Sequence, residues 1–143
     1  MDIPASLKEC HLDHVAIAVS NLDERIKIYQ DLGIIFSEER EIVEEQKVKT
    51  AFGSIDTHAH IELLEPTSSE SPIAKHIEKR GEGLHHLCFR VTDVMSKQKE
   101  MEEKGYKFIY SEPQIGAGNC LVNFLHPKSG GGVLIEISQK QED

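Results

Sequence analysis

The sequence has 143 residues, of which 38% are hydrophobic and 29% are charged, and its formal net charge is −9 at pH 7. This length suits one folded domain with a hydrophobic core, and the excess of acidic residues disfavours nucleic acids and anionic membrane surfaces as partners. No apolar run is long enough to span a membrane, the three cysteines are isolated, and the first residues lack the pattern of a signal peptide. We therefore expect a cytoplasmic protein with reduced thiols. One feature stands out: the chain has eight histidines but only three tyrosines and no tryptophan.

The first half of the chain predicts a strand, a helix and three further strands. β-Branched and apolar residues favour a strand over His11–Val19. Ser20 or Asn21 is a suitable N-cap for a helix that runs to about Leu32 and ends at Gly33. The three further strands are expected at Ile34–Glu38, Lys47–Phe52 and Ala59–Leu64.

Two other segments of this half are expected to lie outside the sheet. The acidic run over residues 38–45 is typical of a solvated loop. After a loop that follows residue 66, a short helix is expected, with Ser71 as its N-cap, Pro72 in the first helical position and Gly81 at its end.

The second half repeats the same order of elements. A strand is expected at Leu84–Val91 and a helix at Val94–Lys104, followed by Gly105. Three strands then follow at Tyr106–Tyr110, Asn119–Leu125 and Gly132–Ser138. The two halves therefore share the order βαβββ.

A nearly constant offset relates landmarks of the two halves. It is 72 residues between His14 and His86 and between Gly33 and Gly105. We predict one α+β domain over residues 7–139, built from two tandem βαβββ modules. Their approximate bounds are 7–65 and 83–139, with a linker and its short helix at 66–82.

The repeat singles out four residues that suit a metal ion. His14 matches His86, and Glu62 matches Glu136 at an offset of 74. If the matched strands pack symmetrically, two imidazoles and two carboxylates come together, a donor set suited to Co²⁺, Ni²⁺, Zn²⁺ or Mn²⁺. Strand alternation places His85 on the face opposite to His86.

Other polar residues near these strands leave alternatives open. His60 shares a face with Glu62 and is a neighbour or a competitor for the same ion. Lys128 lies in a glycine-rich turn before the strand of Glu136, where it contacts a substrate phosphate or is simply solvated. No spacing of glycines matches a phosphate-binding loop or a dinucleotide fingerprint, so no organic cofactor is predicted.

Paired βαβββ modules with this set of His and Glu residues resemble the vicinal oxygen chelate superfamily. That superfamily includes glyoxalase I, extradiol dioxygenases, fosfomycin resistance enzymes and the methylmalonyl-CoA epimerases. Several segments are similar to the epimerases in particular: Leu12–Val19, Ile61–Pro66, Ser71–Lys75, Gly81–His86, Phe124–Ser129 and Gly131–Glu136.

The resemblance implies a fold, an activity and partners. The two modules would form one mixed, half-open eight-stranded barrel around the metal site. The activity would be that of an isomerase that interconverts the (R) and (S) forms of methylmalonyl-CoA, with Glu136 as the catalytic base. The cofactor would be one divalent ion, Co²⁺ first, with Zn²⁺, Ni²⁺ or Mn²⁺ as alternatives, and the assembly a homodimer.

The resemblance also has a gap, and other functions remain open. Thr50 stands where some bacterial epimerases carry a second glutamate, and a threonine hydroxyl is a poor base at neutral pH. Glu45 or a metal-bound water are alternatives for that role. The competing functions are a glyoxalase I-type lyase that acts on a thiol hemithioacetal and a non-catalytic binder of small molecules.

Overall fold

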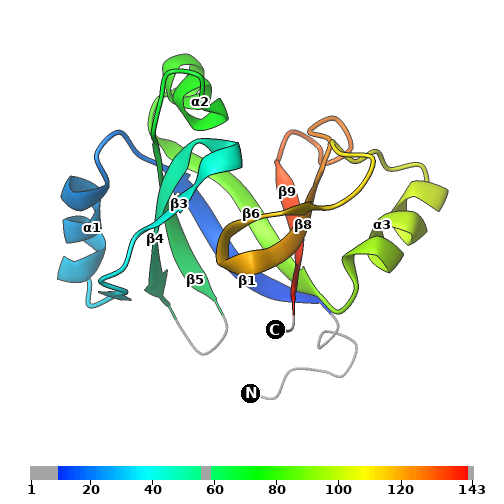
Figure 1. Ribbon diagram of the computed structural model, residues 1–143, viewed down its shortest axis with the longest axis horizontal. Helices are drawn as coiled ribbons and strands as arrows, with labels where there is room; N and C mark the ends of the chain where they lie inside the picture. Colours follow the sequence, from blue (N-terminus) through cyan, green and yellow to red (C-terminus); the bar gives the residue numbers. More distant parts are fainter. Residues whose placement is uncertain (1–9, 56–58, 142–143) are drawn as a thin grey trace. The chain divides into compact units, whose positions relative to one another are not determined.

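The computed structural model describes residues 10–55 and 59–141, which divide into two compact units (Figure 1). The first unit is His14–His85, and the second contains the described residues before His14 and from His86 onward. The predicted start of the domain at residue 7 lies outside the described residues. None of the helices within the described ranges has the length and apolarity needed to cross a lipid bilayer.

The first unit is built on a mixed sheet with the strand order β2-β4-β5-β1. Strand β5 runs parallel to β1 and antiparallel to β4, and the short strands β2 and β3 pair antiparallel with β4. The strands are β1 (Cys10–Ala18), β2 (Ile35–Phe36), β3 (Glu41–Val43), β4 (Val48–Ser54) and β5 (His60–Pro66).

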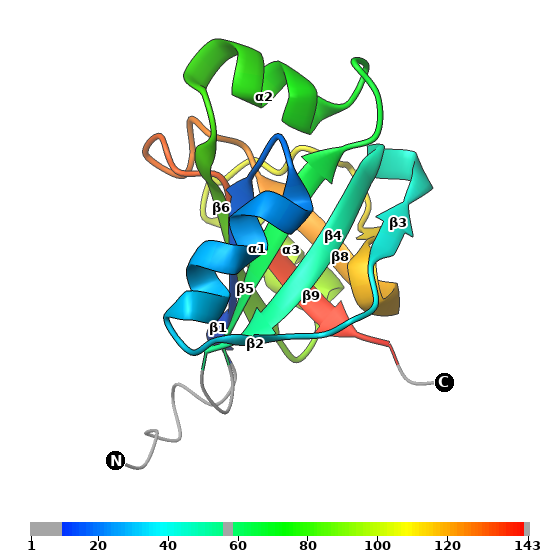
Figure 2. The ribbon, with the colours of Figure 1, turned by 90° about the vertical axis from the view of Figure 1, so that its left-hand side faces the viewer.

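The two faces of this sheet are covered differently. Helix α1 (Leu22–Asp31) lies across one face, where Leu22 and Ile26 pack against Ala51 and Leu63 (Figure 2). Helix α2 (Pro72–Arg80) packs on the other face, at the end of the sheet that contains Ala16, Ala18, Val48 and Leu64. The rest of that second face carries the polar residues described below.

The helix ends follow the sequence signals. Asn21, not Ser20, caps α1, because its side chain accepts a hydrogen bond from the Glu24 N–H at 3.0 Å. Ser71 caps α2 through the Ile73 N–H, with Pro72 next to it and Gly81 at the C-terminal end, as predicted.

The second unit repeats this plan. Its part of the sheet has the order β6-β9-β8-β7, with β6 parallel to β9 and the other pairs antiparallel. Helix α3 starts after the N-cap Asp93 and packs through Val94 against Val91 and Ile137. The elements are β6 (Gly83–Val91), α3 (Val94–Glu103), β7 (Gln114–Ile115), β8 (Cys120–Leu125) and β9 (Ile135–Lys140).

The strand predicted at Tyr106–Tyr110 is wrong. This segment makes one isolated bridge, between Phe108 and Leu125. The buried side chain of Asn123 takes the place of further strand pairing: it accepts the Tyr110 N–H at 3.2 Å and donates to the Tyr110 carbonyl at 3.0 Å and to Gln98 at 2.7 Å. A side chain that satisfies both backbone groups removes the need for a ladder.

The acidic run is only partly the loop that its charge predicts. Residues 41–43 form β3, and Glu44–Gln46 form a short 3-10 helix. The acidic residues of the run are still exposed, as their charge predicts, although residues 41–43 pair with β4.

Candidate functional site

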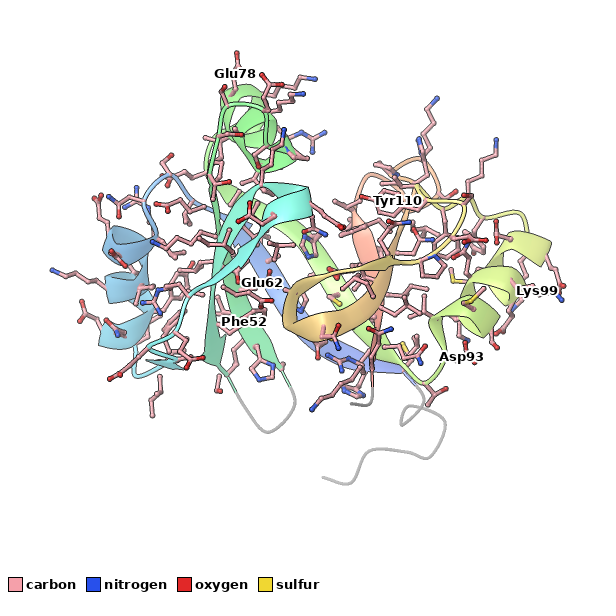
Figure 3. All side chains as sticks on the ribbon, in the orientation of Figure 1. Phe52, Glu62, Glu78, Asp93, Lys99 and Tyr110 are labelled. Carbon is pink, nitrogen blue, oxygen red and sulfur yellow. The ribbon has the colours of Figure 1, made fainter. Side chains whose placement is uncertain are left out.

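In the first unit, a buried histidine and a buried glutamate meet on the polar face of the sheet. Glu62 on β5 is in register with Ala16 on β1, which places it on the same face as His14. His14 Nε2 and Glu62 Oε2 are 2.9 Å apart, and the two residues are only 6% and 5% exposed. Phe52 on β4 lies directly opposite Glu62 (Figure 3). Its ring meets the His14 ring edge-on, with the centroids 6.1 Å apart.

The second unit contains the same arrangement. Glu136 on β9 is in register with Cys88 on β6, on the face that carries His86. His86 Nε2 and Glu136 Oε2 are 2.8 Å apart, and each residue is 7% exposed. Phe124 on β8 lies opposite Glu136 and meets the His86 ring edge-on at 5.5 Å.

The phenylalanines are a part of the site that the sequence analysis missed. Phe52 and Phe124 are 72 residues apart, the same offset that relates His14 and His86. The repeat therefore contained the signal, although an aromatic residue in a strand is usually a core residue. We call each set of three side chains a His–Glu–Phe triad: His14, Glu62 and Phe52 in the first unit, and His86, Glu136 and Phe124 in the second.

A second pair of equivalent contacts fixes each helix to the strand of its triad. The Glu65 carboxylate accepts the Leu22 N–H at 3.1 Å, and the Gln139 side chain accepts the Val94 N–H at 2.9 Å. Glu65 and Gln139 are 74 residues apart, the offset of Glu62 and Glu136. Each contact satisfies one of the free N–H groups at a helix start.

The other histidines near the triads occupy different surroundings. His60 is in register with His14 on the neighbouring strand, and its ring lies 6.5 Å from that of Phe52. His85 packs against His76 of α2, with ring centroids 4.8 Å apart. Burial, and then the charge of Arg80, lower the pKa of the His76 imidazole.

A cavity of about 330 Å³ lies beside the triad of the first unit. Phe52 belongs both to the triad and to the wall of the cavity. The other residues that line the cavity are Ser37, Glu39, Arg40, Glu41 and Thr50. The Thr50 hydroxyl is buried and donates to the Glu41 carbonyl at 3.4 Å. Glu45 is exposed and is not among the lining residues.

Lys128 lies in the turn before β9 and is exposed. Its backbone N–H donates to His126 Nδ1 at 3.2 Å, and the neighbouring turn is closed by hydrogen bonds to the His126 carbonyl. This local structure positions the turn, and a contact between Lys128 and a substrate phosphate stays a prediction.

Glu82 fixes the connection between β1 and α1. Its carboxylate accepts the Ser20 N–H at 2.6 Å and a hydrogen bond from Arg25 Nη2 at 2.8 Å. The Ser20 N–H, followed by Arg25, holds the pKa of the Glu82 carboxyl below its ordinary value.

The donor chemistry of the triads fits a divalent cation. Each unit presents one imidazole nitrogen and one carboxylate oxygen within hydrogen-bond distance of each other, on buried strands. These are the ligand types that borderline first-row ions prefer. Burial of a carboxylate without a partner is costly, so the four residues are positioned for pairing or for ligation.

The chain belongs to the Glyoxalase/Bleomycin resistance protein/Dioxygenase superfamily, whose family profile matches residues 13–124. It is 39% identical over 131 residues to the mitochondrial methylmalonyl-CoA epimerase of Dictyostelium discoideum, covering 90% of this chain and 78% of that protein. The structure superposes with a TM-score of 0.89 on a hypothetical protein from Bacillus halodurans C-125, at 42% identity over 94% of this chain and 96% of that one.

A further solved structure shows a ligand. It is a variant of Streptomyces coelicolor methylmalonyl-CoA epimerase in complex with 2-nitronate-propionyl-CoA, with a TM-score of 0.86 and 34% identity over 92% of this chain and 97% of that one. The predicted resemblance, the α+β fold class of the vicinal oxygen chelate superfamily and the assignment to an isomerase family of enzymes are thereby confirmed.

Proposed function

We propose that the protein interconverts the (R) and (S) forms of methylmalonyl-CoA. The observation that supports this most is the duplicated His–Glu–Phe triad, found in a chain whose relatives are named as epimerases of this substrate. The complex of a relative with an acyl-CoA analogue supports an acyl-CoA as the ligand.

We further propose that His14, Glu62, His86 and Glu136 hold one divalent ion. The ion, when bound, would supply Lewis-acid stabilisation of the negative charge that develops on the thioester oxygen. Co²⁺ remains the first expectation from the family, and Zn²⁺, Ni²⁺ and Mn²⁺ fit the same donors.

The protein's own residues have separate tasks in this proposal. Glu136 takes the proton from C2, which is acidic because it lies between a thioester and a carboxylate. Phe52 and Phe124 hold the His14 and His86 rings edge-on and keep water from their apolar side. The buried setting strengthens the electrostatic interactions of both glutamates.

The test is proton exchange at C2 in D₂O. Metal-loaded protein incubated with methylmalonyl-CoA should incorporate deuterium at C2 at an enzymatic rate, followed by NMR or mass spectrometry. Glu136→Gln should lower the rate by roughly 10²- to 10⁴-fold, the usual contribution of a general base. Glu44→Gln, an exposed glutamate outside the cavity, is the matched control and should exchange like the wild type.

Two outcomes would contradict the proposal. Absence of C2 exchange by wild-type protein rejects the epimerase function. Consumption of methylglyoxal in the presence of a thiol, with no C2 exchange, would instead support the glyoxalase I-type lyase. The homodimer and the cytoplasmic location stay predictions from the sequence.

A further inference from the structure

We propose that Glu41 is the second acid–base residue of the reaction and serves the face of C2 opposite to that of Glu136. This inference rests on the proposed epimerase function. An epimerase has to remove the C2 proton from one face and return a proton to the other, so a single fixed carboxylate is not sufficient.

Thr50 cannot fill this role. An alcohol is a poor base near neutral pH, and the Thr50 hydroxyl already donates to the Glu41 carbonyl at 3.4 Å. With 1% exposure, Thr50 is also closed off from solvent. The position that some relatives occupy with a glutamate therefore supplies no base in this chain.

The register of β3 on β4 places Glu41 next to Thr50, on the neighbouring strand. Glu41 lies directly opposite Thr50 in this antiparallel pair, so the two side chains share a face of the sheet. Phe52, two residues further along β4, shares that face and lies opposite Glu62. Glu41, Thr50 and Phe52 all line the same cavity of about 330 Å³.

Phe52 links Glu41 to the triad of the first unit. Its ring lines the same cavity as Glu41, and Phe52 also lies opposite Glu62 and meets the His14 ring edge-on. The backbone of Glu41 is held in the sheet, and positions held by regular elements are the ones suited to catalysis.

Arg40 gives an independent reason to place the substrate head group in this cavity. Its Nη1 donates to the carbonyls of Ser37 and Glu39, at 2.6 and 3.2 Å. Its Nε is buried and has no hydrogen-bond partner in the described part of the chain. A carboxylate ligand in the cavity would satisfy this donor and offset its desolvation.

The other acidic residues near the cavity are less suited to the role of second acid–base residue. Glu45 belongs to the 3-10 helix and does not line the cavity. Glu39 lines the cavity but precedes β3 and has no register position in the sheet. Variants of Glu39 and Glu45 are therefore included in the experiment below.

The proposed step is balanced in protons and electrons. One glutamate, as carboxylate, takes the C2 proton while the electron pair of the C–H bond moves into the thioester to give the enolate. The other glutamate, as carboxylic acid, gives its proton to the opposite face of C2, and the electron pair returns to form the new C–H bond. The two glutamates have then exchanged protonation states, and solvent exchange restores them.

The experiment compares inversion with exchange. Each pure epimer of methylmalonyl-CoA is incubated in D₂O with metal-loaded protein, and both the inverted fraction and the deuterium at C2 are measured. In Glu41→Gln, inversion should fall by roughly 10²- to 10⁴-fold, while one epimer still exchanges its proton with retention at close to the wild-type rate. Glu136→Gln also removes a proposed metal ligand and should lower the exchange of both epimers.

This split separates a catalytic role from a structural one, because a misfolded site would lose exchange of both epimers. Glu41→Asp keeps a carboxylate and should retain part of the inversion, and Glu44→Gln should behave as wild type. Inversion at the wild-type rate in Glu41→Gln, or the same split in Glu39→Gln or Glu45→Gln, overturns the proposal while the epimerase function stands. Wild-type protein that neither exchanges nor inverts rejects the epimerase function, and the role of Glu41 with it.

Discussion

At the scale of single residues, the triads show how two ordinary strand residues become a buried, closely spaced pair. A histidine and a glutamate in a strand are usually polar side chains on a solvated face. Here the register of β1 on β5, and of β6 on β9, places each pair two positions apart along the same buried face. The phenylalanine of each triad then packs edge-on against the imidazole.

The proposed ligands predict how metal content responds to mutation. Glu136→Ala removes one of four donors, so protein purified without chelator should contain well below one ion per chain, with affinity at least about tenfold weaker. The measurement is metal analysis by mass spectrometry together with competition against a chelator dye.

The matched control is Glu44→Ala, which removes an exposed carboxylate and should leave one ion per chain. Equal metal content in both variants would reject Glu136 as a ligand. Loss in both would indicate that the purified metal is bound non-specifically.

At the scale of elements, helix starts and strand ends are tied together by side chains. Glu65 and Gln139 hold α1 and α3 to the strands of the triads, and Glu82 holds the β1–α1 connection from the start of β6. These contacts keep the strand carrying His14 in place relative to the helix that follows it.

Glu82 gives a pH-dependent prediction. The pKa of the Glu82 carboxyl is lower in the folded state than its ordinary value of 4.5. The charged carboxylate therefore stabilises the fold above pH 4.5, and this stabilisation is lost as the pH falls through the pKa of the folded state. Glu82→Gln should therefore lower the free energy of unfolding at pH 7 by about 1 kcal/mol, a modest figure because the carboxylate is partly exposed.

The measurement is urea denaturation of wild type and Glu82→Gln at pH 7 and at several values below 4.5. The difference between the two proteins should shrink as the pH falls. Glu78→Gln, on the exposed side of α2, is the control and should show no difference at either pH. A difference that is independent of pH would mean that Glu82 acts through packing and not through its charge.

Most elements could be predicted from the sequence because their signals are local. Caps at Asn21 and Ser71, a glycine after each helix and the repeat itself depend on residues close in sequence or on a constant offset. The strand predicted at Tyr106–Tyr110 was wrong because Asn123, more than ten residues away, satisfies the backbone N–H and carbonyl of Tyr110. Such a contact leaves no local pattern.

The sequence also pointed to part of the candidate site. The proposed ligands could be singled out in the sequence because they repeat, whereas Glu41 was not singled out because its relation to Thr50 depends on the register of β3 on β4. The charge of the acidic run predicted exposure correctly and concealed the short strand within it.

At the scale of the whole molecule, the proposed site draws ligands from both units. His14 and Glu62 belong to the first unit, and His86 and Glu136 to the second. An ion held by all four would bind only when both units are folded, so its binding free energy would add to the stability of the entire chain.

This gives a prediction for thermal unfolding. At a free metal concentration of 100 times the Kd, binding should stabilise the native state by about 2.7 kcal/mol, which corresponds to a rise in Tm of about 10 °C for a chain of this size. Glu62→Ala and Glu136→Ala change different units, yet each should lose most of the rise, because each removes a ligand of the same ion. Glu44→Ala should keep it. A rise that survives in one of the two ligand variants would show that the ion is held by the triad of the other unit alone, and that the four residues do not form a single centre.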